Sequence, residues 1–353
     1  MEGLGPDSIL SFLLAFHFVR KVFNQLSRGI RKTKMKRKTY FISLIFFLSL
    51  LSFLTECRLL RYLRTETKDG SRLEKITVDG IERTYWIHLP ENKYSGTEKL
   101  PLVLGLHGRL GSGRNIMEDS KLNRISDREG FIVVYPDGID RSWADGRGAT
   151  PADKQKVDDV HFLEKLIDRI SESHPVDKDK IFIFGHSNGG FMTQRMLIEK
   201  TKRFRAGVSV SSQISEFILR NFEPSGNVSV AFINGTKDST VPYYGGYVRD
   251  GGEILSVEDS IDRWLQWNSC LKQPEIKKKD EKEDGTSVEI YSYNQCKGKT
   301  SVLHYKIVDG GHNWPGVNRK VPFIKMGTPT YELDPGEEIW TFFKSKLEST
   351  SGN

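Results

Sequence analysis

Short, mainly apolar runs alternate with stretches of helical periodicity along most of this chain. The apolar runs lie at residues 102–106, 131–135, 181–184, 228–233 and 303–308. Runs of this kind predict strands buried on both faces, as parallel sheets require. Between them, apolar residues recur every three or four positions, which predicts helices near 157–170, 191–200, 256–267 and 336–347. The alternation predicts an α/β chain, folded as a three-layer sandwich around a mostly parallel central sheet.

Two further patterns lie outside this alternation. Residues 76–78 and 84–89 flank Asp79-Gly80, a turn signal that predicts a β-hairpin. The charged run at 277–284 predicts a solvated hairpin tip. We see no internal repeat, so one catalytic domain over residues 73–347 accounts for the pattern.

The apolar pattern near the N-terminus indicates targeting. Residues 40–54 carry no charge and directly follow three basic residues, Lys36-Arg37-Lys38. A short apolar core behind a basic segment is typical of a secretory signal peptide. The stretch is shorter than the roughly 20 residues that a membrane-spanning helix needs.

The signal pattern begins cleanly at Met35. We therefore interpret residues 1–34 as an over-extended gene start, with a second hydrophobic segment at 9–19 as the alternative. In both cases residues 1–56 form a targeting segment that takes no part in the fold. The mixed polar residues 57–72 are expected to be a tether.

The three cysteines support export. Cys57 follows the apolar core, like the lipidated cysteine of a bacterial lipoprotein; Leu54 fits that signal, but Glu56 stands where a small residue is usual. Lipidation therefore competes with ordinary signal cleavage and with an uncleaved anchor. Cys270 and Cys296 either form a disulfide, which an oxidising compartment permits, or remain free buried thiols. Two cysteines without a nearby pair of histidines do not predict a zinc site.

Positive charge is concentrated in the targeting segment. Of the net charge of +7, residues 1–56 supply nine Lys or Arg against three Asp or Glu, so the rest of the chain is nearly neutral. A nearly neutral domain lacks the basic face that nucleic acid requires, and nucleic-acid binding is not expected. The overall composition, 37% hydrophobic and 28% charged, is that of an ordinary globular protein.

The motif Gly185-His-Ser187-Asn-Gly189 lies between a predicted buried strand and a predicted helix. In that context a G-x-S-x-G sequence predicts a nucleophile elbow, in which a sharp turn exposes the serine hydroxyl. Ser187 is therefore the candidate nucleophile. The alternative is a serine that merely occupies a tight strand–helix turn.

A serine nucleophile needs a base, and the base needs an orienting acid. Two histidines follow Ser187, and we expect His312 to be the base because it lies in a glycine-rich loop, whereas His304 lies within a strand. The loop after the 228–233 strand contains one carboxylate, Asp238, which is the candidate acid. Asp309 is the weaker rival because it is so near His312 in sequence.

An oxyanion hole requires two main-chain N–H groups. We expect one from Asn188, directly after the nucleophile, and one from the glycine-rich loop at 106–113, where Arg109 is a better candidate than Gly108. The alternative is a plain glycine-rich turn. The loop lacks the Gly-Lys-Ser/Thr ending of a phosphate-binding P-loop.

These motifs together resemble the secreted polyhydroxybutyrate depolymerase and feruloyl-esterase-like family of α/β-hydrolases. The likeness spans roughly residues 75–345 and is carried by Leu106-His-Gly-Arg109, Tyr135-Pro-Asp-Gly138, Val157-Asp-Asp-Val-His-Phe-Leu163, Gly185-His-Ser-Asn-Gly-Gly190, Asn234-Gly-Thr-Lys-Asp238 and Gly310-Gly-His-Asn-Trp-Pro-Gly316. Asn313 departs from the pattern, since the family often has Thr there.

The resemblance implies an α/β-hydrolase fold and two-step acyl transfer without a metal or organic cofactor. It also implies that Cys270 and Cys296 form the family's disulfide. Trp143 and Trp314 are candidates for the substrate pocket, with a core role for Trp143 and bracing of the His312 loop for Trp314 as the alternatives.

The sequence thus predicts an exported serine carboxylic-ester hydrolase, extracellular or periplasmic, attached to a membrane through its N-terminal lipid or signal anchor. Its partner would be a small or oligomeric ester: a feruloyl sugar, a hydroxyalkanoate oligomer or an acetyl ester. A serine peptidase or acyltransferase of the same fold is the first alternative, because the triad does not set the acyl acceptor. A binding lipoprotein with a vestigial site is the second.

Overall fold

The computed structural model describes residues 67, 69–91, 98–248, 251–318 and 325–347. Contacts divide the chain into two units, Met1–Thr65 and Glu66–Asn353, and the account that follows concerns the second. The predicted signal segment, Cys57, and residues 58–66 and 68 of the predicted tether lie outside the described residues. The C-terminal end of the predicted tether is part of the folded domain, because Ser71 is buried and Arg72 begins the first strand. Within the described ranges, no helix combines the length and the apolar character needed to cross a membrane.

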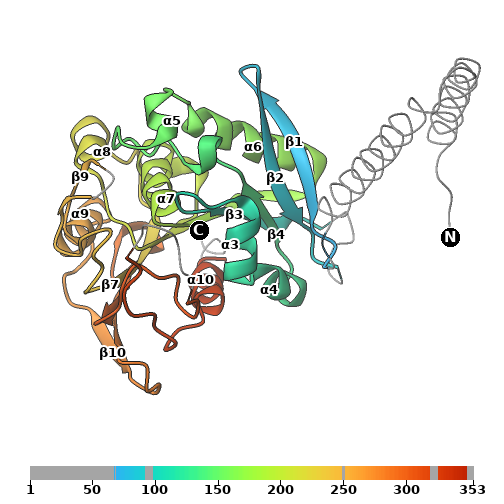
Figure 1. Ribbon diagram of the computed structural model, residues 1–353. Coiled ribbons are helices and arrows are strands. Elements are labelled where there is room, and N and C mark those ends of the chain that lie inside the picture. The colour runs from blue at the N-terminus through green and yellow to red at the C-terminus, as the bar shows by residue number, and fades with distance from the viewer. Residues whose placement is uncertain (1–66, 68, 92–97, 249–250, 319–324, 348–353) are drawn as a thin grey trace, which may run out of the picture. The chain divides into compact units, whose positions relative to one another are not determined.

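A ten-stranded sheet forms the middle of the domain (Figure 1). Its order is β1 (Arg72–Val78), β2 (Ile81–His88), β4 (Ile132–Pro136), β3 (Leu100–Leu106), β5 (Val176–His186), β6 (Ala206–Val210), β7 (Ser229–Gly235), β12 (Val302–Val308), β11 (Ser287–Tyr293) and β10 (Glu275–Lys279). The strands from β4 to β12 pair in parallel, and antiparallel hairpins extend both edges. Two short strands, β8 (Gly246–Tyr247) and β9 (Glu253–Ile254), pair separately.

Helices cover both faces of the sheet. On one face, α6 (Asp159–Ser173), α7 (Asn188–Glu199), α8 (Glu216–Asn221) and α9 (Val257–Trp267) contribute to one apolar cluster with the strands. On the other, α3 (Gly113–Ser120), α4 (Leu122–Glu129) and α10 (Pro335–Lys344) contribute to a second cluster, and these three lie together in Figure 1. The short α5 (Pro151–Lys154) and the 3-10 turns Ile139–Arg141, Thr201–Arg203 and Lys297–Lys299 complete the connections.

Local sequence explains where the main helices begin. Asp158 caps α6 by accepting the main-chain N–H of His161, and Ser256 caps α9 in the same way. Asp334 caps α10, and Pro335 occupies its first position, where the missing N–H has no cost. These polar caps satisfy donors that the first turn of a helix leaves without a partner.

The structure confirms the predicted three-layer α/β fold and adds elements that were not predicted, among them α3, α4, α8 and β6. Each of the five apolar runs forms a strand, and β3 is buried along its whole length. β6 was not predicted, because Ala-Gly-Val-Ser-Val is short and weakly apolar; it is buried because β5 and β7 pair with its edges while α7 and α10 contact it. The charged run at 277–284 is strand in its first part, since β10 continues to Lys279 at the exposed sheet edge, near the bottom of Figure 1.

Candidate active site

A sharp turn between β5 and α7 carries Ser187. Its backbone has φ 52° and ψ −118°, a conformation that residues with side chains rarely adopt. Strand and helix come so close that a Cβ on Gly185 would lie 2.2 Å from the carbonyl oxygen of Gly189. A Cβ on Gly189 would lie 2.3 Å from the carbonyl oxygen of Leu106, so both positions require glycine. The turn holds the Ser187 hydroxyl at the N-terminus of α7, where the helix dipole favours negative charge.

Ser187, His312 and Asp238 form one hydrogen-bonded line. The Ser187 Oγ lies 2.9 Å from His312 Nε2, and His312 Nδ1 lies 2.6 Å from Asp238 Oδ2. The side chains of His312 and Asp238 are each only 3% exposed, whereas Ser187 is half-buried. The imidazole is therefore held by the carboxylate on one side and faces the hydroxyl on the other, as a general base for a serine requires.

The sheet topology brings these three residues together. β5, β7 and β12 run parallel, so the loops that follow them meet at one edge of the sheet. The loops after β7 and β12 are joined by the main-chain N–H of Lys237, which donates to the Gly310 carbonyl at 2.9 Å. Asp238 Oδ1 accepts the N–H groups of Thr240 and Val241, each at 2.8 Å, which leaves Oδ2 for the imidazole.

The rival residues occupy other positions. His304 is buried in β12 between the rings of Tyr243 and Tyr291, and burial lowers its pKa to about 3. Asp309 is half exposed, and its carboxylate pairs with Lys237 Nζ at 2.9 Å. Neither side chain joins the line through Ser187, so the structure favours the predicted trio.

The loop after β3 fixes the direction of the Arg109 N–H. The carbonyl of Gly108 accepts the N–H of Gly111 at 2.9 Å and the Nδ1–H of His107 at 2.8 Å. The N–H of Gly138 donates to His107 Nε2, which places the ring proton on Nδ1, and burial lowers the pKa of His107 and keeps the ring neutral. Because the peptide unit is planar and trans, an anchored Gly108 carbonyl also anchors the Arg109 N–H, which points the opposite way.

The second predicted donor lies beside the first loop. Asn188 is the first residue of α7, so the helix offers no acceptor for its main-chain N–H. Gly108 packs against the nucleophile, since a Cβ on it would lie 3.5 Å from the Cβ of Ser187. Gly108 and Asn188 therefore both border the serine, and Arg109 follows Gly108 in the loop. His107, which anchors the first of them, was not singled out from the sequence; its place after an apolar strand was the available signal.

Comparisons with known proteins agree with this geometry. A model of the prolyl oligopeptidase family, Peptidase_S9, matches residues 123–215, a minor part of the chain that includes Ser187. The acetyl xylan esterase from Aspergillus awamori superposes on 77% of this chain and 99% of its own, with a TM-score of 0.51 at 15% identity. The chain has the α/β-hydrolase fold.

The curated relatives of this chain are named esterases. The putative esterase NocK of Nocardia uniformis subsp. tsuyamanensis is 25% identical over 69% of this chain and 73% of its own length. The probable feruloyl esterase C of Aspergillus niger is 27% identical over 65% and 76%. The bifunctional acetylxylan esterase/xylanase XynS20E of Neocallimastix patriciarum is 22% identical over 66%, but the match spans only 31% of that longer protein. All three of these relatives are thus named as esterases, and each is similar to about two thirds of this chain.

The two tryptophans predicted for the substrate pocket of this hydrolase are core residues. Trp143 is 0% exposed and stacks on Phe162, so it has no surface on which to contact a substrate. Trp314 is 3% exposed and lies edge-on against the ring of His186. Both predictions as pocket residues were wrong, because aromatic rings pack over the two side chains; Trp143 takes the core role that was its alternative. Trp314 does pack beside the residue that precedes the nucleophile.

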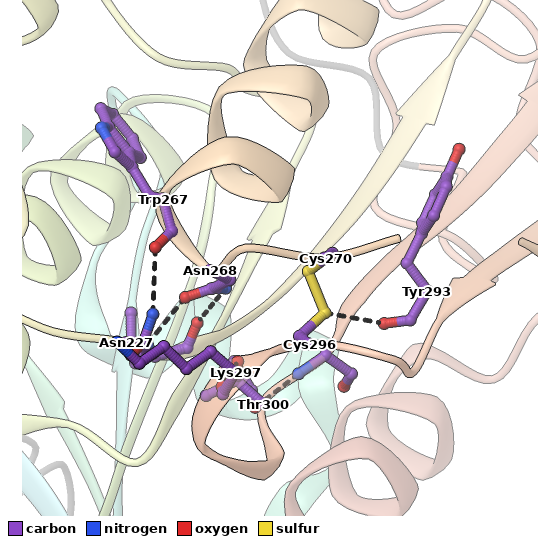
Figure 2. The surroundings of a disulfide bond; sticks show 11 residues. Asn227, Trp267, Asn268, Cys270, Tyr293, Cys296, Lys297 and Thr300 are labelled. Carbon is purple, nitrogen blue, oxygen red and sulfur yellow. Dashed lines mark hydrogen bonds between the residues drawn. A yellow bond between two sulfur atoms is a disulfide. The ribbon is translucent and has the colours of Figure 1, made fainter. Parts of the chain in front are cut away.

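Cys270 and Cys296 are joined in a disulfide (Figure 2). The bond links the chain just after α9 to the turn before β12, and Asn268 nearby bonds the main chain of Val228, at the start of β7, in both directions. A strand that positions the acid and one that positions the base are thus braced at their N-terminal ends. This pair confirms the pairing that the resemblance implied.

A cavity of about 600 Å³ lies away from the triad. It is lined by the 144–148 segment, the α5–α6 region, Phe217 on α8 and charged residues toward the end of α7, and it includes none of Ser187, Asp238 and His312. The reaction site is therefore not this cavity. Across the described residues, no group of three or more His, Cys, Asp and Glu side chains is placed to hold a metal ion.

Proposed function

We propose that this hydrolase cleaves carboxylic esters by two-step acyl transfer, with Ser187 as the nucleophile, His312 as the base and Asp238 as the orienting acid. The observation that carries the proposal is the line of hydrogen bonds from Ser187 Oγ through the imidazole to Asp238, at 2.9 Å and 2.6 Å. A strained turn and a glycine-rich loop border the same hydroxyl.

In the first step, His312 Nε2 takes the Ser187 proton as Oγ bonds to the ester carbonyl carbon. The carbonyl oxygen gains the electron pair of its π bond, and the N–H groups of Asn188 and Arg109 stabilise that charge. The imidazolium, held by Asp238, then protonates the departing alcohol. Water repeats the sequence on the acyl-enzyme and releases the acid, so the chain's own residues account for every proton transfer.

The relatives suggest the class of ester. By their printed names, one relative acts on feruloyl esters and another on acetyl esters of xylan. We therefore favour feruloyl or acetyl esters of sugars over hydroxyalkanoate oligomers. The disulfide supports a site of action outside the reducing cytoplasm, and the N-terminal signal pattern supports export with a membrane tether at Cys57 or the signal anchor.

An ester panel tests this function. The chain and Ser187→Ala would be assayed on nitrophenyl acetate, butyrate and octanoate, methyl ferulate, acetylated xylan, a hydroxybutyrate trimer and a prolyl nitroanilide. Ester turnover that Ser187→Ala abolishes supports the proposal, and the best substrate identifies the acyl group. Turnover of the anilide alone would instead support a peptidase, the activity that the prolyl oligopeptidase family name suggests. A folded chain that turns over none of these substrates would refute both activities.

A further inference from the structure

One buried residue, Trp143, bonds to both main-chain segments beside Ser187, the loop after β3 and the start of α7. The indole Nε1–H of Trp143 donates to the carbonyl of His107 at 2.9 Å, in the loop that carries Arg109. The main-chain N–H of Trp143 donates to Asn188 Oδ1 at 2.8 Å. The Trp143 carbonyl accepts Asn188 Nδ2 at 3.0 Å, so the side chain of Asn188 is held twice by the same residue.

The Asn188 side chain is also hydrogen-bonded to a buried ion pair. Asn188 Nδ2 also donates to Asp145 Oδ2 at 2.6 Å. Asp145 is fully buried, and the guanidinium of Arg147 pairs with the same carboxylate oxygen at 2.8 Å. The guanidinium lies 4.1 Å from the centre of the Phe191 ring on α7. Every polar atom of the Asn188 side chain is thereby bonded, and a fully satisfied buried network is rigid.

We propose that Trp143 is a positioning residue that sets the separation between the two oxyanion donors, the Arg109 N–H and the Asn188 N–H. Trp143 is linked to the Asn188 donor through the Asn188 side chain, which Asp145 also holds. It is linked to the Arg109 donor through the His107 carbonyl. This inference rests on the proposed esterase function. It adds a role for a residue that never touches the substrate.

The separation matters because an oxyanion receives both hydrogen bonds only when each donor lies about 2.7–3.1 Å from the place that the oxygen will occupy. The two donors belong to segments that are far apart in sequence: the loop after β3 and the first turn of α7. Nothing in either segment alone fixes their distance. Trp143 bonds to both segments and therefore holds them at a fixed distance from each other.

The direct test is Trp143→Phe in the full chain. Phenylalanine keeps an aromatic ring against Phe162 but removes the indole N–H and its bond to His107. A small displacement of a catalytic group costs as much as about 100-fold in rate, so we expect kcat to fall about 10- to 100-fold with KM changed less than about threefold. If Trp143 only supported the fold, Trp143→Phe would lower the melting temperature without lowering kcat selectively.

Trp264→Phe is a matched control. Trp264 is also fully buried, and its indole N–H also makes one buried hydrogen bond, to the side-chain Oε1 of Gln194 on α7 at 2.8 Å. The substitution therefore also removes one indole N–H and one buried hydrogen bond, but the lost bond is not to the loop that carries Arg109. We expect a comparable fall in melting temperature and a kcat within about twofold of the wild type.

The affinity for a trifluoromethyl ketone tests the oxyanion donors separately from the later steps of turnover. An aryl trifluoromethyl ketone adds the Ser187 oxygen to its carbonyl carbon, sends the serine proton to His312 and leaves a charged oxygen between the two donors. We expect Trp143→Phe to weaken its binding by about the same factor as kcat, while Trp264→Phe leaves the affinity unchanged. Asn188→Ala gives an independent test, because it keeps the main-chain N–H and removes only the side-chain link; we expect the same pattern, whether or not Trp143→Phe folds.

The outcomes separate this inference from the function on which it rests. Loss of kcat and of ketone affinity in Trp143→Phe or Asn188→Ala, but not in Trp264→Phe, supports the positioning role. An active wild type with both variants at control levels overturns the positioning role and leaves the esterase intact. A wild type that hydrolyses no ester and binds no ketone overturns both.

Discussion

The domain contains two lines of serine, histidine and aspartate, and they differ in what surrounds the serine. In the first, Ser187 Oγ, the His312 ring and Asp238 are joined at 2.9 Å and 2.6 Å. In the second, Ser71 Oγ lies 3.1 Å from His88 Nδ1, and His88 Nε2 lies 2.9 Å from Asp127 Oδ1. The distances alone do not distinguish a reactive site from a structural one.

The surroundings do distinguish them. Ser71 is 0% exposed, and its Oγ accepts the amide of Asn123 at 2.9 Å and donates to Asp69 Oδ1 at 2.9 Å. Asn123 also accepts the hydroxyl of Tyr135, so the second line is one part of a buried network. Ser187 is half-buried and held in a strained backbone at the start of a helix.

The comparison teaches that three residue types in hydrogen-bond reach are not sufficient for catalysis. A nucleophile also needs an exposed face and donors for the oxyanion, which we propose for the Ser187 region, whereas Ser71 is fully buried. The Ser71 line instead joins the residue before β1 to β2 and α4, where its hydrogen bonds satisfy buried polar groups.

The largest contrast is expected between the two serines. Ser187→Ala removes the nucleophile and should lower kcat by about 10⁴- to 10⁶-fold. Ser71→Ala should leave kcat within about twofold, because Ser71 has no route to a substrate. Steady-state hydrolysis of nitrophenyl acetate by both variants measures this. Comparable losses in the two variants would mean that the division between the lines is wrong.

The two acids give the next contrast. Asp238→Asn should lower kcat by about 10⁴-fold, because an amide no longer holds the imidazole in the orientation that accepts the serine proton. Asp127→Asn changes the same atom type beside His88 and should not lower kcat. Activity across pH 6 to 9 checks both variants at matched protein concentration. A slow Asp127→Asn enzyme that is fully folded would contradict the structural role of the second line.

In the free energy of unfolding, the substitution at Ser71 should have the larger effect and the one at Ser187 the smaller. Ser71→Ala leaves buried groups of Asn123 and His88 without one of their partners and should reduce the free energy of unfolding by about 1–3 kcal/mol. Ser187→Ala removes a half-buried hydroxyl, and its effect should stay below about 1 kcal/mol. Urea unfolding followed by tryptophan fluorescence measures both. If Ser187→Ala proves the more destabilising of the two, the second line is not a structural anchor.

His304 extends the comparison to a buried histidine without a carboxylate partner. Its pKa falls from 6.5 to about 3 in the folded state because burial disfavours the charged ring. The unfolded chain therefore binds the extra proton between these values, and stability is lost as pH falls from 6.5 toward 3. His304→Phe should reduce the slope of unfolding free energy against pH by at most about 1.4 kcal/mol per pH unit in that window. Parallel urea titrations at pH 4.5, 5.5 and 7.5 would show it; an unchanged slope would contradict the assignment.

Much of the site could be predicted because its signals are local. The G-x-S-x-G turn lies between an apolar run and a helical pattern, and each feature is contained in a few consecutive residues. His312 was chosen over His304 because it lies in a loop after a strand, and Asp238 was chosen over Asp309 because Asp309 is so near His312 in sequence. Parallel strands align those loops at one edge, so the alternation of elements was enough to bring the trio together.

The sequence by itself predicted the α/β layers and singled out Ser187, His312 and Asp238, which the structure places in one hydrogen-bonded line, because hydrophobic periodicity and turn chemistry act over short distances. Tertiary structure decided the role of Trp143, whose bonds to His107 and Asn188 join positions 36 and 45 residues away. It also decided that Ser71 is buried and Ser187 is not. Burial and hydrogen bonds between distant segments depend on what packs over a residue, and no local pattern records that.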